Sequence, residues 1–193
     1  LNAGMWVWIA SQTFPDRWAI GLVQCLVLSG LIVATFVDFD CFEIPDEISI
    51  GGLCVAPVLS FLVPELHRNG VVVRWLDGAS QAEPTRMAAL SSALLGMAVG
   101  AGILWLIGKV GSRLYGRDAM GFGDVTLMMM IGTFIGWQAG LVAFFLAPFA
   151  GLVIGLLQFA LRRDDVIPYG PFLCLGSAVV IVAWAPIWEW AAP

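Results

Sequence analysis

Hydrophobic runs long enough to enter a lipid bilayer recur along the whole chain, and they restrict the fold more than any other feature of the sequence. Seven such runs cover residues 3–14, 17–37, 48–64, 87–110, 124–136, 138–161 and 171–190. Hydrophobic residues make up 60% of the 193 residues and charged residues only 12%, which is too apolar for one core with a wet exterior. Because a membrane-spanning helix takes about 20 apolar residues, the sequence predicts an all-α polytopic membrane protein with about seven transmembrane helices.

The run at 124–136 is too short to cross a bilayer alone, since an α-helix rises only about 1.5 Å per residue. This segment must therefore begin deep in the membrane, tilt, or form a tight hairpin with the next run through "GWQAG". Glycine and other small residues in "GMAVGAG" and "GLVIGLL" suit close contacts between helices in lipid. The high frequency of glycine in membrane helices explains these stretches equally well.

The net charge limits the partners that the chain can bind, and the cysteine spacing limits metal and disulfide chemistry. The net charge is -5 and no basic stripe is present, which argues against nucleic acid and leaves lipid and protein as partners. The four cysteines contain no CxxC pair, so we interpret them as small buried residues rather than as zinc ligands or a disulfide framework. They are Cys25, Cys41, Cys54 and Cys174.

Five acids follow the second apolar run, with no Lys or Arg among them. They are Asp38, Asp40, Glu43, Asp46 and Glu47, in the stretch "ATFVDFDCFEIPDEI". Solvation of a loop is one explanation for such a patch. The other is a negative surface that attracts a basic partner.

A second acidic motif, "RDAMGFGDVTLMMMIG", leads into the run at 124–136. Asp124 stands directly behind Gly121 and Gly123, and glycine permits close backbone approaches that other residues block, so this turn can fold Asp124 inward. The alternative is that Asp124 only caps the first turn of its helix. Because Asp38 follows its own apolar run just as abruptly, the two acids together favour a functional pair.

If each run crosses the membrane, both acidic motifs lie on the same face of it. The connections 38–47, 111–123 and 162–170 then share one side, and 15–16, 65–86 and the turn near Gln138 lie on the other. The first side carries five basic residues and the second side four, which favours a cytoplasmic position of the first side only weakly. Those on the first side are Lys109, Arg113, Arg117, Arg162 and Arg163, and those on the second are Arg17, Arg68, Arg74 and Arg86.

Two carboxylates at one membrane depth, on different helices, suit an aspartyl protease. In a site of low dielectric they share one proton, so that one accepts a proton from the attacking water while the other donates to the scissile carbonyl. This chemistry needs neither a metal nor a nucleophilic side chain. The only histidine, His67, falls in a loop on the opposite side, and no Ser or Cys has a histidine nearby to activate it.

Three motifs together resemble those of a known family. "VDFDCFEIPDEI", "RDAMGFGDVTL" and "VIPYGPFL" have the order and spacing seen in the type IV prepilin peptidases, which are GxGD membrane aspartyl proteases. The resemblance runs from about Asp38 to Phe172. GxGD alone is weak evidence, but its combination with "IPD" before it and "IPYGP" after it is specific.

The resemblance implies that Asp38 and Asp124 are the catalytic pair of a single transmembrane aspartyl protease domain over residues 1–193. Supporting or substrate-binding roles are expected for Asp40, Glu43, Asp46, Glu47, Gly121 and Gly123. The implied substrates are prepilins or pseudopilins, cut after a short basic leader at the cytoplasmic face of the bacterial inner membrane. No metal or cofactor is expected in the peptidase reaction.

Two features depart from the family pattern. The position two after the GxGD aspartate is often Lys and is Thr126 here, so any task of that cation would fall to Lys109, Arg113 or Arg117. Many bacterial members also begin with an extra helix and a cytoplasmic zinc-binding segment, which we expect upstream of Leu1, giving eight helices in the intact protein. Such members methylate the new N-terminus from S-adenosylmethionine, an activity that this sequence neither supports nor excludes.

Two other classes of protein fit the sequence less well. A proton-coupled transporter also uses intramembrane carboxylates, but it predicts acids near the middle of helices and an inverted repeat, and neither is visible in the sequence. A scaffold protein gives no reason for two inward acids.

Overall fold

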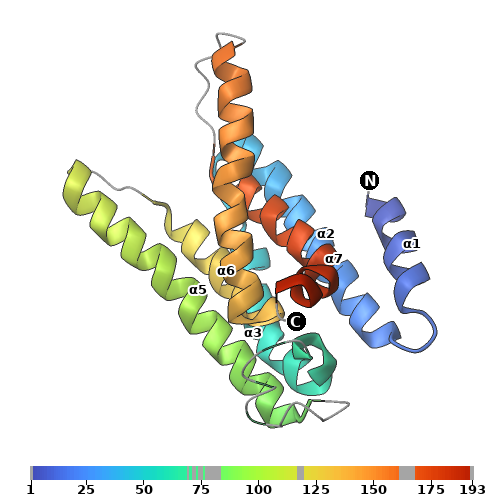
Figure 1. The fold of residues 1–193 in the computed structure, drawn as a ribbon. Helices are drawn as coiled ribbons and strands as arrows, with labels where there is room; N and C mark the ends of the chain where they lie inside the picture. The colour runs from blue at the N-terminus through green and yellow to red at the C-terminus, as the bar shows by residue number, and fades with distance from the viewer. Residues whose placement is uncertain are drawn as a thin grey trace.

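The protein is described by a computed structural model, which covers residues 2–68, 70, 73, 76, 84–116, 120–160 and 168–191. Over these ranges it contains six α-helices, one short 3-10 helix and no strand (Figure 1). The helices are α1 (Asn2–Thr13), α2 (Trp18–Cys41), α3 (Asp46–Leu62), η1 (Pro64–His67), α5 (Arg86–Tyr115), α6 (Phe122–Ala160) and α7 (Gly170–Ala191). The predicted all-α class is confirmed.

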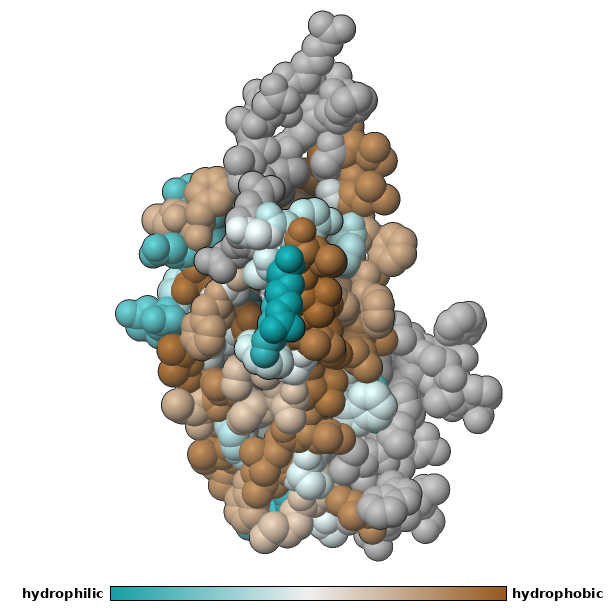
Figure 2. All heavy atoms as spheres, turned by 90° about the vertical axis from the view of Figure 1, so that its left-hand side faces the viewer, coloured by the Kyte–Doolittle hydropathy of each residue, from teal (hydrophilic) through white to brown (hydrophobic). Residues whose placement is uncertain are grey.

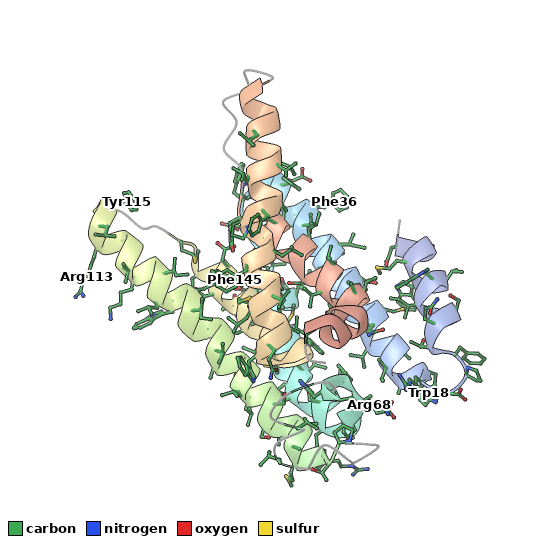
Figure 3. The ribbon with its side chains drawn as sticks, in the orientation of Figure 1. Trp18, Phe36, Arg68, Arg113, Tyr115 and Phe145 are labelled. Carbon is green, nitrogen blue, oxygen red and sulfur yellow. The ribbon has the colours of Figure 1, made fainter. Side chains whose placement is uncertain are left out.

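Several of these helices have the length and the apolar composition of membrane-spanning helices. Three stretches are long and apolar enough to cross a bilayer, namely Trp18–Cys41, Arg86–Tyr115 and Phe122–Ile154. The face on the α5 side of the molecule is mainly hydrophobic (Figure 2). Large apolar side chains such as Phe36 and Phe145 project outward from the bundle (Figure 3) and are about two thirds exposed, at 64% and 63%. Such a surface fits lipid, and the prediction of a polytopic membrane protein is confirmed.

α2 is longer than its apolar run. The run ends at residue 37, whereas the helix continues to Cys41 and ends where Phe42 adopts a left-handed conformation, with φ 56°. The N–H of Phe42 still bonds to the carbonyl of Asp38 at 3.0 Å. Asp38 therefore lies inside the last turn of α2 and not after the helix, because polar side chains do not stop a helix when its backbone bonds can continue.

α6 reverses direction at Gly136, which has φ 80° and ψ 165°, a conformation open essentially to glycine alone. Beyond the break, a methyl group at Gly140 would lie 3.5 Å from the Cα of Gly132, so the two arms run side by side (Figure 1). Of the three alternatives for the run at 124–136, the structure has the hairpin through "GWQAG". The predicted count of seven differs by one, because the runs at 124–136 and 138–161 are the two arms of a single continuous element.

Glycine brings α5 and α6 into close contact, and this is the most extensive helix pair of the described structure. A methyl group at Gly96 would fall on the carbonyl of Gly132, and one at Gly100 would lie 2.5 Å from the carbonyl oxygen of Met128. Gly102, on the same helix, faces open space. The interpretation of "GMAVGAG" as a close helix contact is confirmed for Gly96 and Gly100 and is wrong for Gly102.

The core lies between α2, α5, the first arm of α6 and α7. Its fully buried large side chains include Leu28, Leu31, Leu104, Leu127, Met128, Ile131 and Leu173. Cys25 and Cys174 are buried as expected. The expectation is wrong for Cys41 and Cys54, which are exposed on α2 and α3, since a free thiol behaves as a small apolar group and lipid tolerates it.

Candidate active site

Asp38 is held at the end of α2 by the beginning of α7. Its side chain is only 5% exposed, and the backbone N–H of Gly170 donates a hydrogen bond to its carboxylate. A methyl group at position 170 would fall on Asp38 Oδ2 and lie 3.2 Å from Asp38 Cγ. Only glycine therefore lets the first amide of α7 approach this acid so closely.

Asp124 is the third residue of α6, and it is partly buried. The backbone N–H of Gly121, directly before the helix, donates a hydrogen bond to its carboxylate. This is the back-reaching half of a capping box, in which the third helical residue bonds to the amide of the capping residue. Asp124 therefore does cap the first turn of α6, as the alternative interpretation proposed. It is also partly buried, which a capping role does not require.

The two acids lie together although they are far apart in the sequence. Asp38 and Asp124 are close enough for their charges to interact. Ile44, from the connection between α2 and α3, packs against both glycines that flank the pair: a methyl group at Gly123 would lie 3.3 Å from its Cβ, and one at Gly170 would lie 3.2 Å from its Cδ1. This side chain fixes the end of α2 against the starts of α6 and α7.

Two residues beside the acids were not predicted as site residues. Tyr169 has a buried hydroxyl with no hydrogen-bond partner in the described structure, and burial together with the charge of Asp124 raises the pKa of Tyr169 to about 12. The thiol of Cys174 is hydrogen-bonded to Thr35 and lies within electrostatic reach of both acids. The sequence did contain a signal for Cys174. It stands four residues after Gly170, and this spacing places both residues on the same face of a helix.

The other predicted acids lie at the surface, unlike Asp38 and Asp124. Asp40, Glu43, Asp46 and Glu47 are all exposed. Asp46 and Glu47 lie in the first turn of α3, where the helix dipole favours negative charge. These four acids therefore form an acidic rim, defined by their positions at the end of α2 and the start of α3.

Thr126 replaces the cation expected near the acids. Its side chain is 5% exposed, and its hydroxyl donates to the carbonyl of Gly123 at 2.9 Å. Of the candidate substitutes, Lys109 stacks over the ring of Trp105, with 4.3 Å from Nζ to the ring centroid. Arg113 projects away from α5 (Figure 3). Four further cations of the charge comparison lie outside the described residues: Arg74, Arg117, Arg162 and Arg163.

The described residues contain no cluster of three or more His, Cys, Asp or Glu side chains that could hold a metal ion. A cavity of about 420 Å³ lies between α1, α2, η1, the turn of α6 and α7, and its lining includes Arg17, Arg68 and Val180. Trp18 and Arg68 mark that end of the molecule in Figure 3, and Tyr115 marks the other. The cavity is thus remote from the two acids.

The fold and the site are those of a polytopic membrane protein with paired carboxylates at one end of its helices. A family model described as the type IV leader peptidase family matches residues 25–156, more than half of the chain, and the match includes both acids. The chain therefore belongs to the type IV leader peptidase family, as the resemblance of its motifs predicted.

Curated relatives are named prepilin leader peptidase/N-methyltransferase. The one from Aeromonas salmonicida (strain A449) is 26% identical over 186 residues, which cover 94% of this chain and 56% of the relative. The one from Myxococcus xanthus (strain DK1622) is 30% identical over 142 residues, which cover 73% of this chain and 36% of the relative. The chain spans about half the length of the first of these relatives. No solved structure matches it significantly.

Proposed function

We propose that this chain carries the peptidase site of a membrane aspartyl endopeptidase that removes the short basic leader of type IV prepilins or pseudopilins. The observation that carries the proposal is the meeting of Asp38 and Asp124, from α2 and α6, beside the first amide of α7. Two such carboxylates in a water-poor site supply an acid and a base without any further group. Family membership and the names of the relatives point to the same reaction.

In the proposed reaction the two carboxylates share one proton. The charged one accepts a proton from water as the water attacks the scissile carbonyl, and the protonated one donates to the carbonyl oxygen. Each carboxylate accepts one backbone amide bond, Asp38 from Gly170 and Asp124 from Gly121, so both are held in place for this exchange.

The acidic rim supports a basic substrate segment. Asp40, Glu43, Asp46 and Glu47 carry four negative charges at the same end as the two acids, and all four are exposed to an approaching leader. This arrangement suits a site at the cytoplasmic face of the bacterial inner membrane, where the basic leader of a prepilin lies. We place the site there because that orientation also follows the weak bias of the basic residues.

Methylation of the new N-terminus remains a hypothesis for the intact protein, because the relatives are also named N-methyltransferases. S-adenosylmethionine would have to deliver its methyl group to the amine that cleavage releases next to Asp38 and Asp124. The 420 Å³ cavity does not fit this role, because it lies at the opposite end of the helices. We therefore assign no described residue to the methyl donor.

A proton-coupled transporter receives no support. It would place its acids near the middle of helices, whereas Asp38 lies in the last turn of α2 and Asp124 in the first turn of α6. None of the relatives reported above is named a transporter.

The decisive experiment incubates the purified protein with a prepilin and sequences the N-terminus of the product. Asp38→Asn and Asp124→Asn should each lower kcat by about 10² to 10⁴-fold, since Asn keeps the shape of the side chain but cannot transfer a proton. Asp16→Asn is the matched control, because Asp16 is an exposed acid between α1 and α2, away from the pair. Full cleavage by either active-site variant, or an intact prepilin with the unmodified protein, would contradict the proposal.

A further inference from the structure

A second buried polar cluster lies at the opposite end of the helices, where α6 turns. His67 in η1 is 2% exposed and Ser92 in α5 is fully buried. His67 Nδ1 and Ser92 Oγ both lack a hydrogen-bond partner in the described structure. Buried polar atoms almost always have a partner, so two orphaned ones at the same place call for an explanation.

The hydrogen bond on the other ring nitrogen fixes what His67 Nδ1 needs. His67 Nε2 lies 3.0 Å from the hydroxyl oxygen of Ser60. Ser60 has only one hydroxyl proton and donates it to the carbonyl of Ala56 at 2.8 Å, so it must accept from Nε2–H. Nδ1 of the neutral ring is then an acceptor in need of a donor. Burial lowers the pKa of His67 to about 4, which keeps the ring neutral at neutral pH.

Ser92 is free to donate, unlike its neighbour. Ser91 donates its hydroxyl proton to the carbonyl of Ala88 at 2.8 Å, as many helical serines do. Ser92 makes no such bond within α5. Its hydroxyl therefore offers one unused proton, and its oxygen offers unused lone pairs, inside the protein.

Gly136, at the break in α6, lies between these groups. The point that a methyl group at Gly136 would occupy lies 3.4 Å from Ser92 Oγ, 3.5 Å from His67 Nδ1 and 3.9 Å from Gln138 Oε1. Three polar atoms from η1, α5 and the second arm of α6 thus surround one small region at van der Waals distance. The three groups bring no formal charge, which suits a neutral hydrogen-bonding molecule better than an ion.

We infer that His67, Ser92 and Gln138 together bind one buried water molecule at the turn of α6. The water donates one proton to His67 Nδ1 and the other to Gln138 Oε1, and it accepts the proton of the Ser92 hydroxyl. Three hydrogen bonds are the usual number for a buried water, and every orphaned atom gains a partner. The water joins η1, α5 and the second arm of α6 at the turn.

The chain is well suited to a direct test, because His67 is its only histidine. The full-length chain, labelled with ¹⁵N-histidine and reconstituted in lipid, would be studied by proton-detected solid-state NMR at neutral pH. We expect Nε2 to carry the proton, Nδ1 to resonate as a hydrogen-bonded acceptor, and magnetisation to pass from a water proton to Nδ1. A protonated Nδ1, a signal typical of a free acceptor, or a signal that moves when Na⁺ replaces K⁺ would each overturn the inference.

Two serine variants separate a bridging water from a direct bond between Ser92 and His67. With Ser92→Ala the water keeps its bonds to His67 and Gln138, so the Nδ1 signal should stay that of a hydrogen-bonded acceptor, while the Tm falls by a few degrees. Ser91→Ala is the matched control and should change neither quantity. If Ser92→Ala instead moves Nδ1 to the value of a free acceptor, Ser92 itself is the donor and the inferred water is wrong.

Discussion

Gly170 shows how much of the site depends on backbone atoms. Its amide reaches Asp38 because the residue has no side chain, and the same position touches Ile44. Tyr169, one residue earlier, lies next to Asp124. Gly170 thus bonds to one acid, and Tyr169 lies within electrostatic reach of the other.

Gly170→Ala is expected to lower kcat strongly. The added methyl group falls on the Asp38 carboxylate and must displace it, and a shift of about 1 Å at a reacting group costs on the order of 10²-fold in rate. The measurement is the initial rate of leader cleavage at saturating prepilin. Gly51→Ala in α3 is the control, because a methyl group there meets nothing within 4 Å. Equal kcat values for the two variants would show that the contact with Asp38 is unimportant.

The sequence predicted the two acids of the site but not the groups that lie next to them. Asp38 and Asp124 stand out because charge next to an apolar run is rare and costly. A backbone amide leaves no mark in the sequence, so the bond from Gly170 could not be predicted. The approach of Tyr169 to Asp124 depends on how three helices pack, which one sequence does not give. Glu43 and Glu47 were recognisable as exposed acids, but their distance from the pair was not.

Between helices, the contact of α5 with the first arm of α6 sets where Asp124 lies. Gly96 and Gly132 bring the two backbones together, and Gly100 repeats the contact one turn away. Backbone approach of this kind replaces the hydrophobic driving force that helices lack inside lipid. The first arm, Phe122 to Ile135, is only about 21 Å long, so this contact must hold a helix that does not cross the bilayer alone.

Gly96→Leu is therefore expected to destabilise the protein, and Gly102→Leu is not. A side chain at position 96 must push against the backbone of Gly132, whereas position 102 faces open space. Overpacking of this kind costs about 1–3 kcal/mol or more. Thermal unfolding in one detergent would give the comparison. A Tm for the Gly96 variant equal to that of the Gly102 variant would contradict the close contact.

The helices themselves were largely predictable, because apolar runs locate them directly. Their ends were not: α2 and α5 continue past their runs to Cys41 and Tyr115, since hydrogen bonding rather than hydropathy decides where a helix stops. The hairpin of α6 was one of three alternatives, and Gly136 decided among them through a conformation that the sequence permits but does not demand.

Over the whole molecule, the exposed acids and the paired carboxylates share one end. The acidic rim lies beside Asp38 and Asp124, and the polar cluster around His67 lies at the far turn of α6. The face seen in Figure 2 is mainly apolar between them. A basic segment that approaches the membrane surface would therefore meet the rim before it meets the two acids.

Replacing Glu43 and Glu47 by Gln tests this electrostatic role. KM for a prepilin should rise several-fold with kcat unchanged, because each exposed charge contributes only about 0–1 kcal/mol to capture of the leader. The rise should shrink as salt is added, since the Debye length is about 8 Å at physiological ionic strength. A prepilin with a neutral leader should show no difference. A fall in kcat with constant KM would place these acids in the catalytic machinery instead.

The bond from Gly170 to Asp38 also has a consequence for the order of events during synthesis. Asp38 leaves the ribosome early, Asp124 follows 86 residues later, and the amide that completes the environment of Asp38 comes later still, with α7. Until α7 is made and inserted, Asp38 lacks this bond. On the proposed function, leader cleavage is therefore expected only after α7 has been made and inserted.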